Sequence, residues 1–185
     1  MEESLKNEWE KFEELLVEIF NPSNKKKDRE VTILLGLYGE YITNFLLENK
    51  TTKLKEVSSK DLNQDIKLRI LYELKIISDS EYDVLDKIRK IRNEYAHKLE
   101  LSQKDYDKIK SWMENITINW DEKNEDPKSL EKMIRKNPFL KFELACLAKI
   151  GYLLTKIARE KGQEIQKTII FEVKIEGQIH KLKIA

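Results

Sequence analysis

Residues 81–97 of this 185-residue chain read EYDVLDKIRKIRNEYAH, and their order of apolar and charged residues decides the fold. Apolar side chains recur every three or four positions, which is the period of an α-helix. At about 100° per residue, one arc of the helix collects Val84, Ile88, Ile91, Tyr95 and Leu99. We therefore predict an amphipathic helix that starts at a Ser80 cap and runs to about Leu99.

A band of polar residues lies beside this buried stripe. It consists of Arg89, Arg92, Asn93 and His97, with the small Ala96 in its middle. The two arginines can hold a phosphate, and an imidazole can move a proton near neutral pH. Arg92 and His97 are five positions apart, about 140° round a helix, so one regular helix does not aim both at one atom. We expect either that the helix ends or bends here, or that a second copy completes the site.

The helical period continues on both sides of this segment. It predicts further helices over residues 3–20, 28–48, 61–77 (starting at Ser59 or Asp61), 102–116 (capped by Ser102), 129–136 and 139–160. Gly36 and Gly39 interrupt the second of these, and close approach of a neighbouring helix would explain both. In the third, the residues expected to face inward are Leu62, Ile66, Ile70, Leu71 and Leu74.

The period changes to two near the C-terminus. Residues 168–175 and 178–184 alternate around Glu176-Gly177, which is typical of a β-hairpin. A lone hairpin is marginal in water, so we expect its apolar face to dock on the helices or on another chain. The chain is thus divided into a bundle core (1–120), additional packing helices (121–162) and a hairpin (163–185).

Composition limits the possible functions. The chain has 35 Lys and Arg against 34 Asp and Glu, a net charge of +1. This balance argues against binding nucleic acid by bulk electrostatics, and direct DNA binding is therefore less favoured, although a local basic site stays possible. Only five Gly and three Pro favour long helices over a turn-rich β fold.

The single cysteine, Cys146, excludes an internal disulfide and indicates a reducing compartment, so we expect a cytoplasmic protein. It lies in an apolar helical run, where a buried structural thiol is expected. No stretch approaches the roughly 18 apolar residues of a membrane span, so no membrane association is expected. No cluster of His, Cys and carboxylates has the spacing of metal ligands, and neither metal nor cofactor is expected.

Residues 65–77 and 81–97 together resemble the mannitol operon repressor (MltR-like) family, a branch of the HEPN superfamily, over about residues 62–102. Arg92 and His97 match the Arg-x4-6-His motif of that superfamily. The resemblance implies an all-α, HEPN-like antiparallel bundle that forms a homodimer with the two motifs facing a shared cleft. Many such proteins are metal-independent endoribonucleases, among them toxins and phage-defence proteins.

By this resemblance, Arg92 would stabilise charge on the scissile phosphate and His97 would transfer the proton, with Arg89 and Asn93 in support. The nucleophile would be the RNA 2′-hydroxyl, so no metal is required. HEPN toxins that pair with nucleotidyltransferase antitoxins have a Tyr two residues after the His, where this chain has Leu99. An antitoxin or regulatory protein is nevertheless a possible partner.

Two alternatives stay open. Mannitol repressor relatives are described as regulators, so the band could serve a non-enzymatic transcriptional regulator or protein-interaction module. In the plainest interpretation, Arg89 and Arg92 are surface salt-bridge partners and His97 is a polar residue at a helix end.

Overall fold

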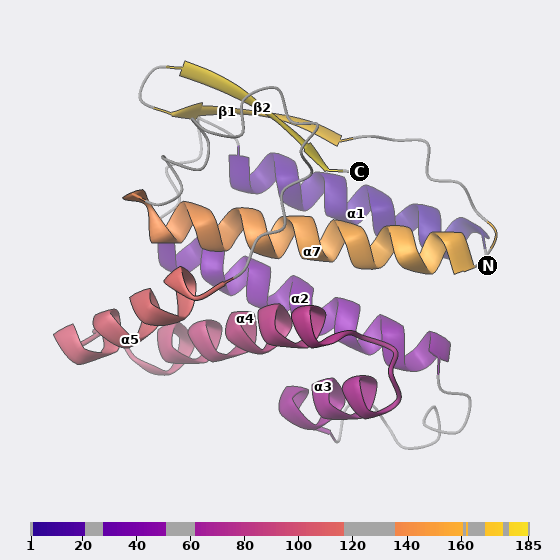
Figure 1. Ribbon diagram of the computed structural model, residues 1–185, viewed down its shortest axis with the longest axis horizontal. Coiled ribbons are helices and arrows are strands. Elements are labelled where there is room, and N and C mark those ends of the chain that lie inside the picture. Colours follow the sequence, from indigo (N-terminus) through magenta and orange to yellow (C-terminus); the bar gives the residue numbers. More distant parts are fainter. Residues whose placement is uncertain are drawn as a thin grey trace. The chain divides into compact units, whose positions relative to one another are not determined.

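The computed structural model describes residues 2–20, 28–50, 62–116, 136–160, 162, 169–175 and 178–184. Within these ranges lie six helices, α1 (Glu2–Phe20), α2 (Asp28–Lys50), α3 (Gln64–Glu73), α4 (Asp79–His97), α5 (Gln103–Glu114) and α7 (Pro138–Glu160), and the strands β1 (Ile169–Ile175) and β2 (Gln178–Ile184) (Figure 1). The expected all-α character is confirmed for these helical parts. The predicted helix at 129–136 lies almost wholly outside the described residues.

The chain divides into two compact units. One is continuous, residues 27–117, and contains α2, α3, α4 and α5; the other joins residues 1–26 to 118–185. Residues 1–120 were predicted to form one bundle core, whereas in this division α1 belongs with the C-terminal residues. The polar band lies entirely within the 27–117 unit.

Helices α2 and α4 form the centre of the 27–117 unit and run antiparallel. Gly36 near the start of α2 lies against Arg92 near the end of α4, and Gly39 lies against Ile88 and Leu85 one turn further along. A glycine has no Cβ, so the neighbouring helix can approach more closely at these two positions. The prediction that both glycines mark a close helix approach is confirmed.

Helix α4 begins two residues earlier than predicted. The N-cap is Ser78, whose hydroxyl accepts a hydrogen bond from the backbone N–H of Glu81. The Glu81 carboxylate accepts one from the Ser78 backbone in return. The predicted Ser80 cap was wrong, because Glu81, the acidic residue that closes this reciprocal pair, lies three positions after Ser78.

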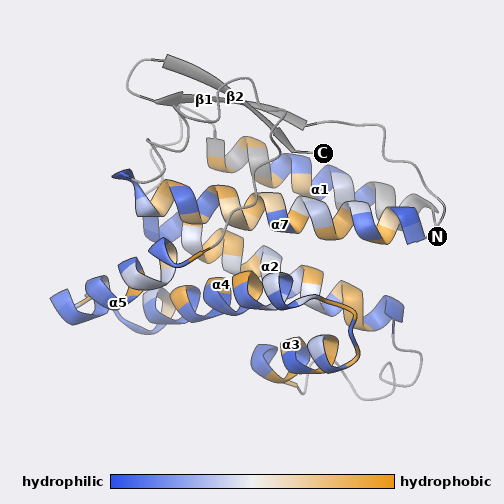
Figure 2. Cartoon of the chain, in the orientation of Figure 1, coloured by the Kyte–Doolittle hydropathy of each residue, from blue (hydrophilic) through white to orange (hydrophobic). Residues whose placement is uncertain are grey.

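The predicted buried stripe of α4 is correct except at its end. Val84, Ile88, Ile91 and Tyr95 are buried, while Leu99 is 92% exposed. The helix stops at His97, so Leu99 leaves the helical wheel on which its burial was predicted. Hydrophobic and hydrophilic residues alternate along the α4 ribbon as an amphipathic helix requires (Figure 2).

Helix α3 is shorter than predicted at both described ends. Its N-cap is Asn63, whose side-chain oxygen accepts a hydrogen bond from the N–H of Ile66. The helix ends at Glu73 instead of Ile77, because Lys75 adopts a left-handed φ of 56°. The N–H of Ile76 then bonds the carbonyl of Leu71 at 2.9 Å, which closes the helix in a Schellman turn.

The buried face of α3 agrees with the predicted one at Leu71 and differs from it at Ile66 and Leu74. The residues buried are Gln64, Lys67, Leu68 and Leu71, whereas Ile66 and Leu74 are exposed. Leu68 and Leu71 are fully buried, and Asp65 is held by an ion pair with Arg89 of α4. These contacts fix the rotation of the short helix, so the apolar row that includes Ile66 and Leu74 faces solvent.

Helix α5 follows α4 through a short connection. Its N-cap is Ser102, as predicted, with a reciprocal pair of hydrogen bonds to Asp105. Only Ile109 and Met113 of this helix are buried. Contacts between Glu94 and Lys108, near the end of α4 and the middle of α5, hold the two helices side by side (Figure 1).

The other unit contains α1 and α7 side by side, together with the strand pair. On α1 the buried residues are Trp9, Phe12, Leu15 and Ile19. Cys146 of α7 is buried, and burial raises the pKa of its thiol well above the ordinary value. The prediction that Cys146 is buried is confirmed. Among the described residues, no helix is long and apolar enough to cross a membrane.

Strands β1 and β2 pair antiparallel. The register places Phe171 opposite Leu182, Val173 opposite His180 and Ile175 opposite Gln178. The turn at residues 176–177 and the strand side chains lie outside what the structure describes. The docking of the apolar face of this hairpin therefore stays a prediction.

Candidate functional site on helix α4

Arg92 is held by helix α2. Its Nη1 lies 2.9 Å from Oε2 of Glu40, in an ion pair whose side chains are 22% and 34% exposed. Its Nε donates weakly to Oδ1 of the adjacent Asn93, at 3.4 Å. A guanidinium has five N–H donors, so these two contacts leave three donors with no hydrogen bond inside the described residues.

The hydrocarbon part of the same side chain lies across Gly36. A Cβ atom added at position 36 would stand 2.4 Å from Cδ of Arg92 and 2.7 Å from its Cβ. Real side chains do not approach so closely, so any residue larger than glycine at position 36 would displace Arg92 or the whole of α4. Gly36 and Glu40 therefore fix the stem and the head of Arg92 from one turn of α2.

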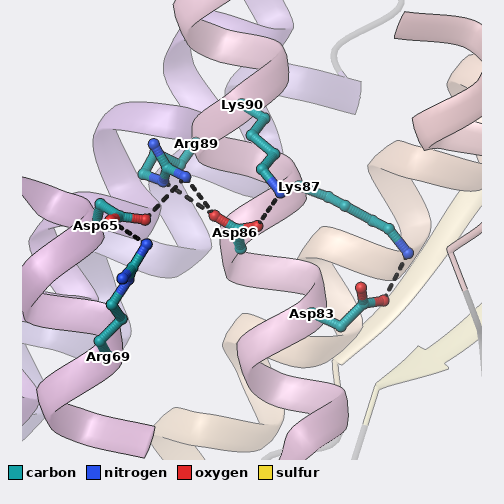
Figure 3. A network of polar contacts seen from close by, with 7 residues as sticks. All are labelled: Asp65, Arg69, Asp83, Asp86, Lys87, Arg89 and Lys90. Atoms are coloured by element: carbon teal, nitrogen blue, oxygen red, sulfur yellow. Dashed lines mark hydrogen bonds and ion pairs between the residues drawn. The ribbon is translucent and has the colours of Figure 1, made fainter. Parts of the chain in front are cut away.

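Arg89 points to a different part of the molecule (Figure 3). Its Nη2 lies 2.5 Å from Oδ1 of Asp86 on α4 and 3.1 Å from Oδ1 of Asp65 on α3. Asp65 also binds Arg69, and Asp86 also binds Lys90. Arg89 is thus the centre of an ion-pair network that ties α3 to α4.

Each cation in this network has a carboxylate partner within the folded chain. Burial raises the pKa of the Asp86 carboxyl, but hydrogen bonds from Lys90 and Arg89 outweigh that effect, so the pKa is lowered overall. Asp86 is therefore ionised at neutral pH and holds the charge of Arg89. A phosphate that bound Arg89 would have to compete with two carboxylates already in place.

His97 is the last residue of α4 and is exposed. It makes no hydrogen bond or ion pair to any residue that the structure describes. Ala96 before it is also exposed, so no bulky side chain of the described residues covers this side of the last turn.

The structure brings Arg92 and Asn93 into contact and places Arg89 one turn away, but it does not bring Arg92 and His97 together. Helix α4 is continuous from Asp79 to His97, so the five-residue spacing keeps its angular separation. Arg92 turns towards α2, while His97 lies exposed at the helix end. Of the two geometries expected from the sequence, the helix does end at His97, and completion of the site by a second copy of the chain stays a prediction.

Glu40 was not predicted from the sequence. Its position four residues after Gly36 places it on the same face of α2, but that spacing does not indicate which residue of another helix lies there. Among the described residues there is no group of three His, Cys, Asp or Glu side chains that could hold a metal ion.

Three comparisons with known proteins gave no match: no protein-family model, no curated protein and no solved structure matches this chain. The interpretation of the polar band therefore depends on its own geometry and on the motif spacing.

Proposed function

We propose that this protein is a HEPN-type, metal-independent endoribonuclease that acts as a homodimer, of the toxin or phage-defence kind. The observation that carries the proposal is that one helix carries both a fixed arginine and an exposed histidine. Arg92 is held by Glu40 and still has donors to spare, and His97 is exposed five residues later.

The chemistry follows from these two groups. The 2′-hydroxyl of the RNA attacks the adjacent phosphorus, its proton passes to an imidazole, and the bond from phosphorus to the 5′-oxygen breaks. The free donors of Arg92 would bind the phosphoryl oxygens as negative charge develops on them. His97 would accept this proton as general base and return it to the leaving 5′-oxygen as general acid.

A second copy of the chain supplies the geometry that one helix lacks. In a two-fold dimer, Arg92 of one protomer and His97 of the other can face the same phosphate. The exposed Ala96 and Leu99 lie on either side of His97, and the small Ala96 side chain allows another chain to approach closely. Sedimentation of the purified protein tests this part: a monomer at micromolar concentration contradicts the dimer.

The cleavage experiment uses single-stranded RNA and transfer RNA in EDTA. We expect the wild type to cleave, and His97→Ala to lose about 10²- to 10⁴-fold in rate, which is typical for loss of an acid–base group. The matched control is His180→Ala, which removes the only other histidine of the chain. Cleavage that persists in His97→Ala contradicts the assignment of His97.

For the arginine, Arg92→Gln is compared with Arg69→Gln, which removes a side chain that is 68% exposed and bound to Asp65. We expect cleavage to fall in the first variant and to persist in the second. Equal loss in both would indicate that RNA is bound by general surface charge.

A non-enzymatic regulator or interaction module is the second candidate. The observation in its favour is that both arginines of the band already have carboxylate partners in their own chain. Absence of cleavage by the wild-type dimer on both RNAs would favour this function.

A further inference from the structure

The end of helix α4 lacks the usual features that stop a helix from fraying. The C-cap Lys98 is extended, with φ −121° and ψ 122°, and the next residue is Leu99 instead of a left-handed glycine. The last turn of a helix has carbonyl groups with no partner within the helix and opens easily unless something holds it. His97 lies in that last turn, so its position depends on how the connection to α5 is held.

Lys98 makes two ion pairs across the connection to α5. Its Nζ lies 2.7 Å from Oε2 of Glu94 on α4 and 2.5 Å from Oδ1 of Asp105 on α5. The residue directly after His97 therefore joins the last turn of one helix to the first turn of the next.

Both carboxylates in this joint use their second oxygen as well. Oε1 of Glu94 binds Nζ of Lys108 on α5, and Oδ2 of Asp105 accepts hydrogen bonds from the Ser102 backbone N–H and hydroxyl. We call this group, Glu94, Lys98, Ser102, Asp105 and Lys108, the α4–α5 clamp.

The pKa directions agree with a set of mutually bonded ions. The hydrogen bond from Lys98, followed by those from Ser102, lowers the pKa of Asp105 to about 2. Hydrogen bonds from Lys108 and Lys98 lower the pKa of Glu94, and hydrogen bonds to Asp105 and Glu94 raise that of Lys98. All three stay charged across the neutral range.

A third helix holds the same connection. Nη1 of Arg29, in the first turn of α2, donates to the backbone carbonyl of Leu99 at 3.1 Å. The short segment from Lys98 to Ser102 is thus held at three points: the Lys98 side chain, the Leu99 carbonyl and the N-cap Ser102. Such an arrangement fixes backbone position more firmly than any one exposed ion pair.

We propose that Lys98 is a positioning residue for His97: through the α4–α5 clamp it keeps the last turn of α4 helical and the imidazole at a fixed place on the surface. This inference depends on the proposed function for its catalytic meaning, but the structural role of Lys98 stands by itself. Displacement of a catalytic group by about 1 Å can cost up to about 10²-fold in rate.

The experiment compares Lys98→Met with Lys98→Arg and with Lys90→Met. Lys90 makes a similar ion pair with the carboxylate four residues before it, and its side chain is 43% exposed against 38% for Lys98. In Lys98→Met we expect the backbone NMR order parameters of residues 96–101 to fall from about 0.85 to below about 0.6. Lys98→Arg, which keeps the charge, and Lys90→Met should retain the wild-type values.

In cleavage assays we expect Lys98→Met to lower kcat about 10- to 100-fold, with KM unchanged, and Lys98→Arg to restore most of it. Unchanged order parameters in Lys98→Met would overturn the positioning role, whether or not the protein cleaves RNA. If the last turn is disordered in Lys98→Met and the wild type cleaves no RNA, the positioning role of Lys98 is supported. The proposed function alone is then overturned.

Discussion

Arg92 lies in the middle of the α2–α4 contact, whereas His97 lies where α4 ends and the connection to α5 begins. The first is fixed by direct contact, its stem on Gly36 and its head on Glu40. The second makes no such contact with the described residues and is placed by the backbone that carries it. A packed residue should therefore show its importance in stability, while an exposed one should show it in local order and in activity.

The largest effect is expected where the packing around Arg92 is broken. Gly36→Ala would force a Cβ atom to within 2.7 Å or less of three Arg92 atoms. Overpacking costs about 1–3 kcal/mol, which exceeds the roughly 1 kcal/mol that alanine gains over glycine in a helix. We expect a lower free energy of unfolding in urea, followed by circular dichroism.

Gly39→Ala is the control for that substitution. Its nearest neighbour would be Cγ2 of Ile88 at 3.5 Å, an ordinary contact distance. This variant should keep its stability or gain up to about 1 kcal/mol. If the two alanine variants have the same free energy of unfolding, the contact between Arg92 and Gly36 is not as close as described.

A smaller effect is expected from the ion pair at the head of Arg92. A double-mutant cycle of Glu40→Gln and Arg92→Gln should give a coupling energy of about 0.2–1 kcal/mol, as partly exposed pairs do. The measurement is again the free energy of unfolding, at low and high salt. A coupling of zero would mean that Gly36 alone orients the arginine.

At the His97 end of α4 we expect the stability of the protein to decrease modestly at acid pH. Asp105 has a pKa lowered to about 2, so its contribution to stability is present above its unfolded pKa of about 4 and is lost as pH falls towards 2. Thermal unfolding should show the midpoint fall over this range. Asp105→Asn should be less sensitive to acid there, and an equal slope in both proteins would contradict the clamp.

The smallest effect on stability is expected for His97→Ala. An exposed side chain without partners among the described residues contributes within about 0.5 kcal/mol. Unfolding by urea should therefore match the wild type, which also makes this variant a clean test of activity. A decrease in the free energy of unfolding well above that value would show that His97 packs against other residues, and its exposed position would be wrong.

The sequence predicted the helices and the stripe of α4 because burial of one face repeats with the helical period. It also predicted that a helix approaches Gly36 and Gly39, but not that an arginine would be the closest neighbour. Periodicity reports which side of a helix is apolar, and it carries no information on which distant residue packs there.

Helix α3 shows the limit of the same argument. Leu71 is buried as predicted, but Ile66 and Leu74, which were expected inside, are exposed, and Leu68 and Lys67, which were not, are 0% and 4% exposed. A ten-residue helix offers several overlapping apolar rows, and the choice between them is made by its neighbours. The Arg89–Asp65 ion pair is one such contact, and it joins residues 24 positions apart that no local pattern connects.

The contact between Gly36 and Arg92 also has an evolutionary consequence. A side chain at position 36 and a long one at position 92 would occupy the same volume, so the two positions cannot vary independently. Among relatives of this chain, we expect an arginine at 92 to be accompanied by glycine at 36, and loss of the glycine to be accompanied by a glycine at 92 or by a wider spacing of the two helices, because the Cβ of residue 92 is itself within the contact. Arg92 would then be conserved for its packing against Gly36 as well as for its proposed role in binding phosphate.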